Sequence, residues 1–300
     1  MKKIVHSLIF IVLGGLIWYL FIKSYDYTIR FESNTFAGAI NQSLKLWDKT
    51  LKPVEGIVQN GSLYRLTQKL KFGDSTHIYQ WKIKPLTDST SRVQVNITDT
   101  EHSLMNKIKV PFSDTDFEKG SRKKVLDFME ELKDHVDKFK VTIVGIEEIP
   151  GKYVAYLPIK TSQLQKAGGM MKNFSYLSET LLYNQAEFNG FPMVEITEWD
   201  QQQDSLAYHL CYPIIRSERL PTQTDIQYKK IFPKRALKAE YYGNYITSDR
   251  AWYALLDYAK KNNISVEPNP IEVFHNNPST DYGETTWKAE IYMPLREEID

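Results

Sequence analysis

Glu290 is the residue whose type and place most strongly suggest chemistry, because it is a carboxylate within the otherwise apolar run 289–295. The run and its flanks predict a strand that is buried against a helix and a sheet. A carboxylate buried there without a partner would lose much of its solvation energy or have a raised pKa. We therefore expect either a network of hydrogen-bond donors or a cationic ligand to compensate its charge.

His209 is the second candidate, because aligning Pro213 with Pro294 superposes His209 on Glu290. If both strands face one groove, the two side chains could form an acid–base pair that activates water. A lone histidine on a strand is more often an ordinary core or edge residue, so catalysis is the minority interpretation. We assign no catalytic residue from the sequence.

Four aromatic residues complete the predicted ligand-binding set with Glu290 and His209. Aromatic faces attract cations and planar apolar groups, so such residues are suited to line a ligand site. The four are Tyr156, Trp199, Tyr241 and Tyr292, and Trp287 is a further candidate. Taken singly, each is more often a core residue, and that alternative stays open.

Several other chemistries lack the residues that they need. Cys211 is the only cysteine, which excludes an internal disulfide, a cysteine-based zinc site and a CxxC redox pair. The histidines have none of the usual metal-binding spacings, so we predict no metal site and no cofactor. Gly168 and Gly169 lack the GKS/T ending of a phosphate loop, and we expect them to break or kink a helix.

The composition limits the partners. The 38 Lys and Arg residues nearly cancel the 37 Asp and Glu residues, which leaves no basic excess for a nucleic-acid backbone. We therefore predict no nucleic-acid partner. A chain of 300 residues, 42% of them hydrophobic, can bury a sizeable core, and its length favours two soluble units.

The N-terminal segment 4–22 contains no Asp, Glu, Lys or Arg. As a helix it would reach about 28 Å, close to the roughly 30 Å of bilayer hydrocarbon. Trp18 and Tyr19 near its end suit the membrane interface and argue against cleavage of a signal peptide. We predict a single-pass anchor over 1–24, with a buried core helix as the alternative. Two lysines before it favour a cytoplasmic N-terminus and an extracytoplasmic or periplasmic soluble part.

Residues 25–140 have the pattern of one α+β unit. Alternation over 27–32 predicts a strand, and the apolar spacing over 36–47 predicts a helix. Three further runs predict an antiparallel sheet, namely 62–68, 77–83 and 93–97. Helical spacing over 117–139 predicts a long helix that buries one stripe against that sheet. This order resembles the START-like (SRPBCC) family, which implies a helix-grip fold with an apolar cavity between sheet and helix.

A pattern of strand, helix, strand and strand occurs twice within 141–300. The first copy has the runs 151–158, 161–188, 193–199 and 206–213. The second copy has the runs 236–242, 248–261, 271–274 and 287–294. Two such copies predict a pseudo-symmetric α+β domain with a groove between them.

The second copy resembles the GyrI-like small-molecule-binding family, also called the AraC-type effector-binding domain. The resemblance rests on Tyr242-Gly243-Asn244-Tyr245, Ala251-Trp252, Glu272-Val273 and Ala289-Glu290-Ile291-Tyr292-Met293-Pro294. It implies that the acid at position 290 contacts cationic aromatic ligands. Some members of that family are hydrolases of small electrophilic molecules. The whole order of segments also resembles uncharacterised bacterial membrane proteins.

The sequence therefore predicts an α+β chain with a transmembrane helix, a START-like domain over 25–140 and a tandem βαββ, GyrI-like domain over 141–300. The predicted function is membrane-anchored binding of small apolar or cationic aromatic ligands. Two alternatives remain, a hydrolase that uses Glu290 and a protein-interaction module.

Overall fold

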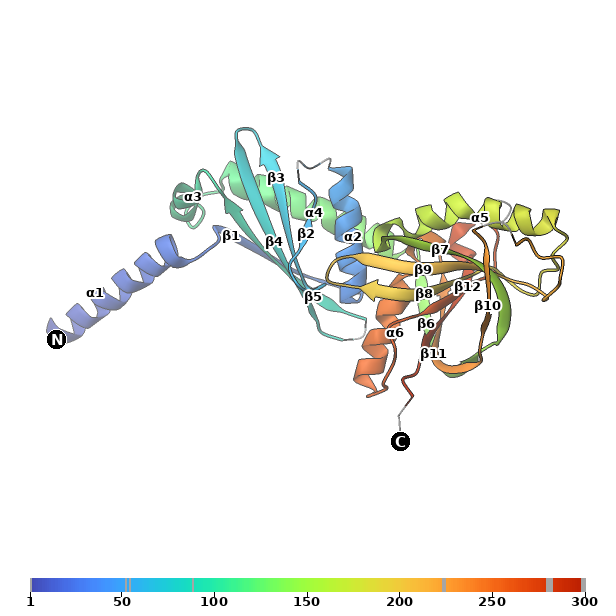
Figure 1. Ribbon diagram of the computed structural model, residues 1–300. Coiled ribbons are helices and arrows are strands. Elements are labelled where there is room, and N and C mark those ends of the chain that lie inside the picture. Colours follow the sequence, from blue (N-terminus) through green and yellow to red (C-terminus); the bar gives the residue numbers. More distant parts are fainter. Residues whose placement is uncertain are drawn as a thin grey trace. The chain divides into compact units, whose positions relative to one another are not determined.

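The computed structural model describes residues 2–51, 53, 55–87, 89–222, 225–278 and 283–297 (Figure 1). The chain divides into two compact units, Met1–Leu86 with Thr90–Lys133 and Asp134–Asp300 with Thr87–Ser89. The described residues contain two antiparallel sheets and six α-helices, which confirms the predicted α+β class.

The first unit begins with α1 (Lys2–Ile17), which continues as the π-helical turn η1 (Trp18–Ile22). The helix over Lys3–Ile22 is long and apolar enough to cross a membrane. Its apolar side chains are exposed, so it is not the core helix that was the alternative. Membrane anchors and signal sequences share this length and composition.

The rest of the first unit is a five-stranded sheet with three helices. Its strands are β1 (Tyr27–Ser33), β2 (Val58–Gln59), β3 (Arg65–Phe72), β4 (Ser75–Pro85) and β5 (Ser91–Asp99), in the order β1-β5-β4-β3-β2. The helices are α2 (Ala37–Thr50), α3 (Ser103–Lys109) and α4 (Asp116–Val136). Trp47 of α2, Trp81 of β4 and Phe128 of α4 pack with ring centroids 5.1 to 6.5 Å apart. These ring contacts join α2, β4 and α4 in the core of the first unit.

The second unit is an eight-stranded sheet with two long helices on one face. The first set of elements is β7 (Lys152–Ser162), α5 (Lys166–Tyr183), β8 (Met193–Asp200) and β9 (Ser205–Pro213). The second set is β11 (Lys234–Tyr242), α6 (Arg250–Lys261), β12 (Ile271–Phe274) and β13 (Lys288–Pro294). The sheet order β10-β7-β9-β8-β12-β13-β11-β6 places the two sets edge to edge through β8 and β12.

Two strands of this sheet lie outside the runs expected from the sequence. They are β6 (Lys140–Ile149) and β10 (Gln227–Ile231). Each precedes one copy of the repeat but pairs with the first strand of the other copy, β6 with β11 and β10 with β7. The exchange completes the pseudo-twofold arrangement of the sheet.

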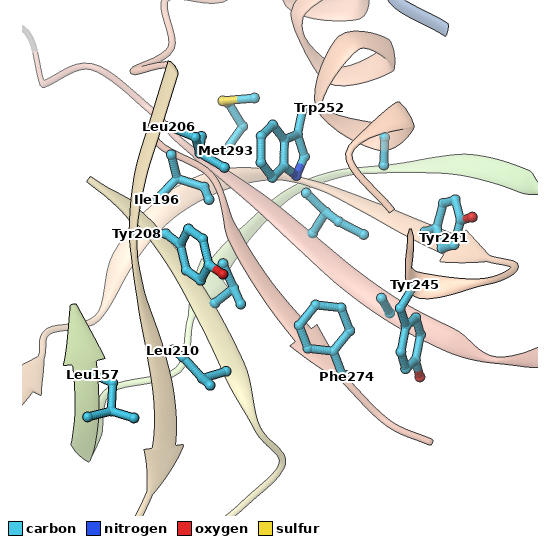
Figure 2. Close-up of a cluster of buried hydrophobic side chains, with 14 of the residues drawn as sticks. Leu157, Ile196, Leu206, Tyr208, Leu210, Tyr241, Tyr245, Trp252, Phe274 and Met293 are labelled. Atoms are coloured by element: carbon cyan, nitrogen blue, oxygen red, sulfur yellow. The ribbon is translucent and has the colours of Figure 1, made fainter. Parts of the chain in front are cut away.

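Strand alternation gives this sheet two different faces. The face toward the helices carries a large apolar cluster, to which β9 contributes Tyr208 and Leu210, β12 contributes Phe274 and α6 contributes Trp252 (Figure 2). The opposite face carries a smaller cluster that includes Cys211 and Tyr292. The face on which a strand residue lies therefore decides which environment it meets.

Helix α5 runs without a break through Gly168 and Gly169, so these glycines do not end the helix. A Cβ atom at position 169 would collide with the hydroxyl of Tyr208. That hydroxyl donates a hydrogen bond to the carbonyl of Lys166 over 3.0 Å. Gly169 therefore permits close packing of the helix on β9.

Candidate ligand-binding site

A cavity of about 690 Å³ opens on the helix side of the second unit. Its walls come from α5, β9, the end of β12, the short helical turn η3 (Tyr245–Thr247), and the segments before β8 and β13. The lining residues are Ala167, Met170, Met171, Phe174, Ser175, Phe191, Pro192, Leu210, Tyr212, Asn244, Tyr245, Ile246, Phe274, His275, Asn276, Asn277, Pro278 and Trp287. A volume of this size is typical of small-molecule sites.

The lining is mainly apolar and aromatic. Asn244, His275 and Asn276 supply polar groups, and the lining as described contains no Asp, Glu, Lys or Arg. Met171 and Phe191 expose about half or more of their surface, which leaves apolar side chains in contact with solvent. Such a rim is typical of a surface that binds an apolar molecule, and methionine adapts well to different shapes.

Tyr245 holds one wall of the cavity in place. Its hydroxyl donates to the carbonyl of Lys288 over 2.7 Å and accepts from the backbone N–H of Asn276 over 2.9 Å. Its ring centroid lies 4.7 Å from that of Phe274 and 5.5 Å from that of Trp287. These hydrogen bonds and ring contacts hold the aromatic wall in one arrangement, which limits the conformational entropy that binding would cost.

Glu290 lies on the face of the sheet opposite the helices, beside several donors. Lys238 Nζ and Lys288 Nζ lie 3.3 and 3.2 Å from its carboxylate, and the Tyr292 hydroxyl donates to it over 2.9 Å. Burial by itself raises the pKa of Glu290, but the hydrogen bonds and neighbouring positive charges lower the pKa to about 2. Of the two expected forms of compensation, the structure contains the donor network.

One contact links Glu290 with the cavity. Nε2 of His275, a lining residue, lies 3.4 Å from the Glu290 carboxylate. The imidazole ring also packs against the Phe191 ring, with centroids 4.5 Å apart. His275 therefore stands between the carboxylate and the ligand space.

His209 has a different acid partner from the one considered above. Its Nδ1 lies 2.8 Å from Glu195 Oε2, and Lys229 pairs with the same carboxylate. Burial raises the pKa of Glu195, but hydrogen bonds from His209 and Lys229 lower it below its usual value. Strands β8 and β12 separate His209 on β9 from Glu290 on β13, so these two do not form the acid–base pair.

The four predicted aromatic residues lie on both faces of the sheet. Tyr156 and Tyr292 share the face of Glu290, and Tyr156 donates to Gln227 over 2.7 Å. Trp199 packs on Trp252 within the helix-side cluster, and Tyr241 is buried there. The described lining includes none of the six residues of the predicted set, whereas it does include Trp287. Their binding role stays a prediction.

Among the described residues of this unit, the most deeply buried carboxylate is that of Glu272 on β12, which the sequence singled out only through the family resemblance. Its side chain is 0% exposed and that of Lys166 is 1% exposed. Lys166 Nζ lies 2.6 Å from Glu272 Oε2, while Ser248 Oγ and Trp252 Nε1 donate over 2.8 and 2.9 Å. An internal ammonium group thus balances this acid.

The lining residues of α5 were also missed, although a helical pattern could have suggested them. Met170, Met171 and Phe174 are spaced one and three residues apart and share one side of the helix. Without the position of the sheet, that side could not be distinguished from a core face.

Comparisons with known proteins give only distant structural similarity. No family model and no curated protein matches the chain. The crystal structure of the EcmrR C-terminal domain has 13% identity and a TM-score of 0.45, and the match covers 53% of this chain and 99% of that chain. SAV2435 bound to tetraphenylphosphonium has 10% identity and a TM-score of 0.36, with 52% and 94% covered. A hydrolase from Listeria innocua has 9% identity and a TM-score of 0.32, with 56% and 98% covered. Similarity at this level does not assign a family or an activity.

Proposed function

We propose that the second unit binds a small apolar or aromatic molecule in the cavity beside α5, and that the helix Lys3–Ile22 anchors the chain in a membrane. The observation that carries the binding proposal is the cavity of about 690 Å³ with aromatic and methionine walls. Because Tyr245 is held by two hydrogen bonds, the wall does not have to be ordered by the ligand.

We further propose that rings rather than a carboxylate dominate recognition. The faces of Tyr245, Phe274 and Trp287 can hold a neutral ring or a delocalised cation. Glu290 lies behind His275 and already pairs with two lysines, so its effect on a ligand would be indirect. Large aromatic cations and neutral aromatics are therefore the proposed ligand class.

The family assignments belong to the same proposal. We propose that 141–300 is a GyrI-like domain, which is supported by its two successive βαββ sets and by the motif residues of the second copy. For 25–140 we propose a START-like fold, supported by the order of β1, α2, the sheet and α4.

Hydrolysis is not part of the proposal. A general base works best with a pKa near the operating pH, and a carboxylate with a pKa of about 2 is a weak base at neutral pH. Glu290 also lies on the face of the sheet away from the cavity, so it is poorly placed to activate water beside a bound molecule.

Calorimetry on the full-length chain in lipid nanodiscs tests the binding proposal, with tetraphenylphosphonium as the cationic probe and triphenylphosphine oxide as the neutral probe. Empty nanodiscs correct for partition into lipid. Trp287→Leu should weaken binding about tenfold, because an aromatic contact contributes roughly 1 to 1.5 kcal/mol. The matched control is Tyr183→Leu on α5, which removes an exposed ring outside the lining. The proposed site is refuted if neither probe binds saturably. It is also refuted if Trp287→Leu and Tyr183→Leu bind the probes with equal affinity.

A further inference from the structure

Helix α3 and the turn after it have a reversed distribution of polar and apolar side chains. Four apolar side chains are exposed, namely Leu104, Met105, Ile108 and Phe112, the last of them to 88%. Asn106 and Lys107, by contrast, are buried. A surface helix in water buries its apolar stripe and exposes its polar face, so α3 has the opposite of the aqueous arrangement.

The buried polar groups of α3 have specific partners, which set the orientation of the helix. Asn106 Nδ2 donates to Asp99 over 3.1 Å. Lys107 Nζ donates to the carbonyls of Lys23 and Leu20 over 2.5 and 3.3 Å. Because these bonds hold the polar side inward, the apolar side must face outward.

These partners also join α3 to the end of the apolar N-terminal helix. The Tyr19 hydroxyl donates to the carbonyl of Lys107 over 3.1 Å. Asp26, just after the helix, accepts from the Ser103 hydroxyl over 2.5 Å and from the backbone N–H of Asp99 over 2.9 Å. Figure 1 shows α3 beside the junction between the N-terminal helix and β1. The two elements are fastened together at several points.

The contacts give α3 a definite depth relative to the apolar helix. Leu20 lies two residues before Ile22, so α3 meets the helix within about 5 Å of its end, at 1.5 Å per residue. In a membrane, this is the depth of the headgroup region and of the aromatic belt. The exposed Lys109 of α3 could meet anionic headgroups there.

We propose that the apolar face of α3, together with Phe112, inserts into the interface of the bilayer that the helix Lys3–Ile22 crosses. This inference rests on the membrane part of the proposed function. Continuity with the transmembrane helix identifies the occupant as lipid. The inserted face adds a second attachment point, which fixes the orientation of the first unit on the membrane.

Site-specific fluorescence on the full-length chain in proteoliposomes tests the insertion. Cys211 is fully buried, so the unmodified chain is the blank for thiol labelling. A nitrobenzoxadiazole label is attached to Ile108→Cys and to Phe112→Cys, and quenching by nitroxide-bearing phospholipids is compared with quenching by aqueous iodide. Vesicles contain phosphatidylcholine and phosphatidylglycerol.

Two matched labelling sites complete the test. Lys84→Cys is the aqueous control, because position 84 is exposed and far from α3. Asn106 of α3 contacts Asp99, which pairs with His77 at the other end of β4, and Lys84 lies seven residues from His77 along that strand. That spacing corresponds to about 23 Å along the strand. Phe21→Cys reports on the transmembrane helix itself and thereby separates the two proposals.

Insertion predicts that lipid nitroxide quenches the labels at 108 and 112 by at least about twofold, while iodide quenches them little. The label at 84 should have the reverse response. If the label at 21 is quenched by lipid while those at 108 and 112 behave like that at 84, the insertion is refuted and the anchor stands. Protection of 108 and 112 from both quenchers would indicate a protein contact and also refute it. A label at 21 that lipid does not quench would refute both proposals.

Discussion

Replacing Lys166 by Met should destabilise the second unit more than any exposed charge substitution. The change removes the ammonium group but keeps an unbranched side chain of similar length. It leaves the buried Glu272 carboxylate with Ser248 and Trp252 as its remaining donors. Breaking a fully buried pair by removing one partner strands an uncompensated charge, which is costly.

The expected loss follows from the burial and the number of bonds. Lys166 supplies two of the four hydrogen bonds to Glu272, over 2.6 and 2.9 Å, from a site that is 1% exposed. We expect the free energy of unfolding to fall by about 3 to 5 kcal/mol. For a unit of this size the melting temperature should then fall by about 10 °C.

Scanning calorimetry of the full-length chain provides the assay, since only the transition of the second unit should move. Lys69→Met is the matched control, because Lys69 pairs with Glu55 at the exposed surface of the first unit. That change should cost at most about 1 kcal/mol. The double variant Lys166→Met with Glu272→Gln should be more stable than the sum of the single effects predicts, by about 2 kcal/mol.

Three results would contradict this reasoning. If Lys166→Met lowers the melting temperature of the second unit no more than Lys69→Met lowers that of the first unit, the buried pair contributes nothing measurable. If the double variant shows simple additivity, the two side chains do not interact in the folded chain. A melting temperature unchanged by Glu272→Gln alone would likewise argue against a buried, charge-balanced carboxylate.

Three further predictions concern the same unit. Gly169→Ala should lower the free energy of unfolding by about 1 to 3 kcal/mol, because its methyl group would displace the Tyr208 hydroxyl. Gly168→Ala should instead raise the free energy of unfolding by about 0.5 to 1 kcal/mol. Equal effects of the two substitutions in urea denaturation would contradict this packing. Glu290→Gln should be less stable than the unmodified chain at pH 7 by about 1 to 3 kcal/mol. Because the folded pKa is lowered to about 2 from 4.5, that difference should persist above pH 4.5 and vanish as the pH falls toward 2; a difference independent of pH would count against the donor network. A fragment of residues 134–300 should unfold cooperatively, and a broad transition would show that this unit depends on the first.

Local periodicity determined much of the secondary structure of this protein. The spacing over 248–261 corresponds to α6, and the runs 271–274 and 287–294 correspond to β12 and β13 within a residue. Side-chain alternation and helical spacing depend only on near neighbours, so the order strand, helix, strand and strand was readable in both copies. The apolar N-terminal helix was equally evident from composition.

Tertiary structure decided which residues meet. Alternation shows that Glu290 and Ile291 point to opposite faces, but only the packing of α6 determines that Glu290 lies away from the helices. Lys166 and Glu272 are 106 residues apart, and their pairing depends on where α5 packs on the sheet. The cavity arises from the same docking, because its walls are brought together from segments that are distant in sequence. Charge compensation and cavity shape are therefore properties of the packed sheet and helices, and no single stretch of the chain encodes them.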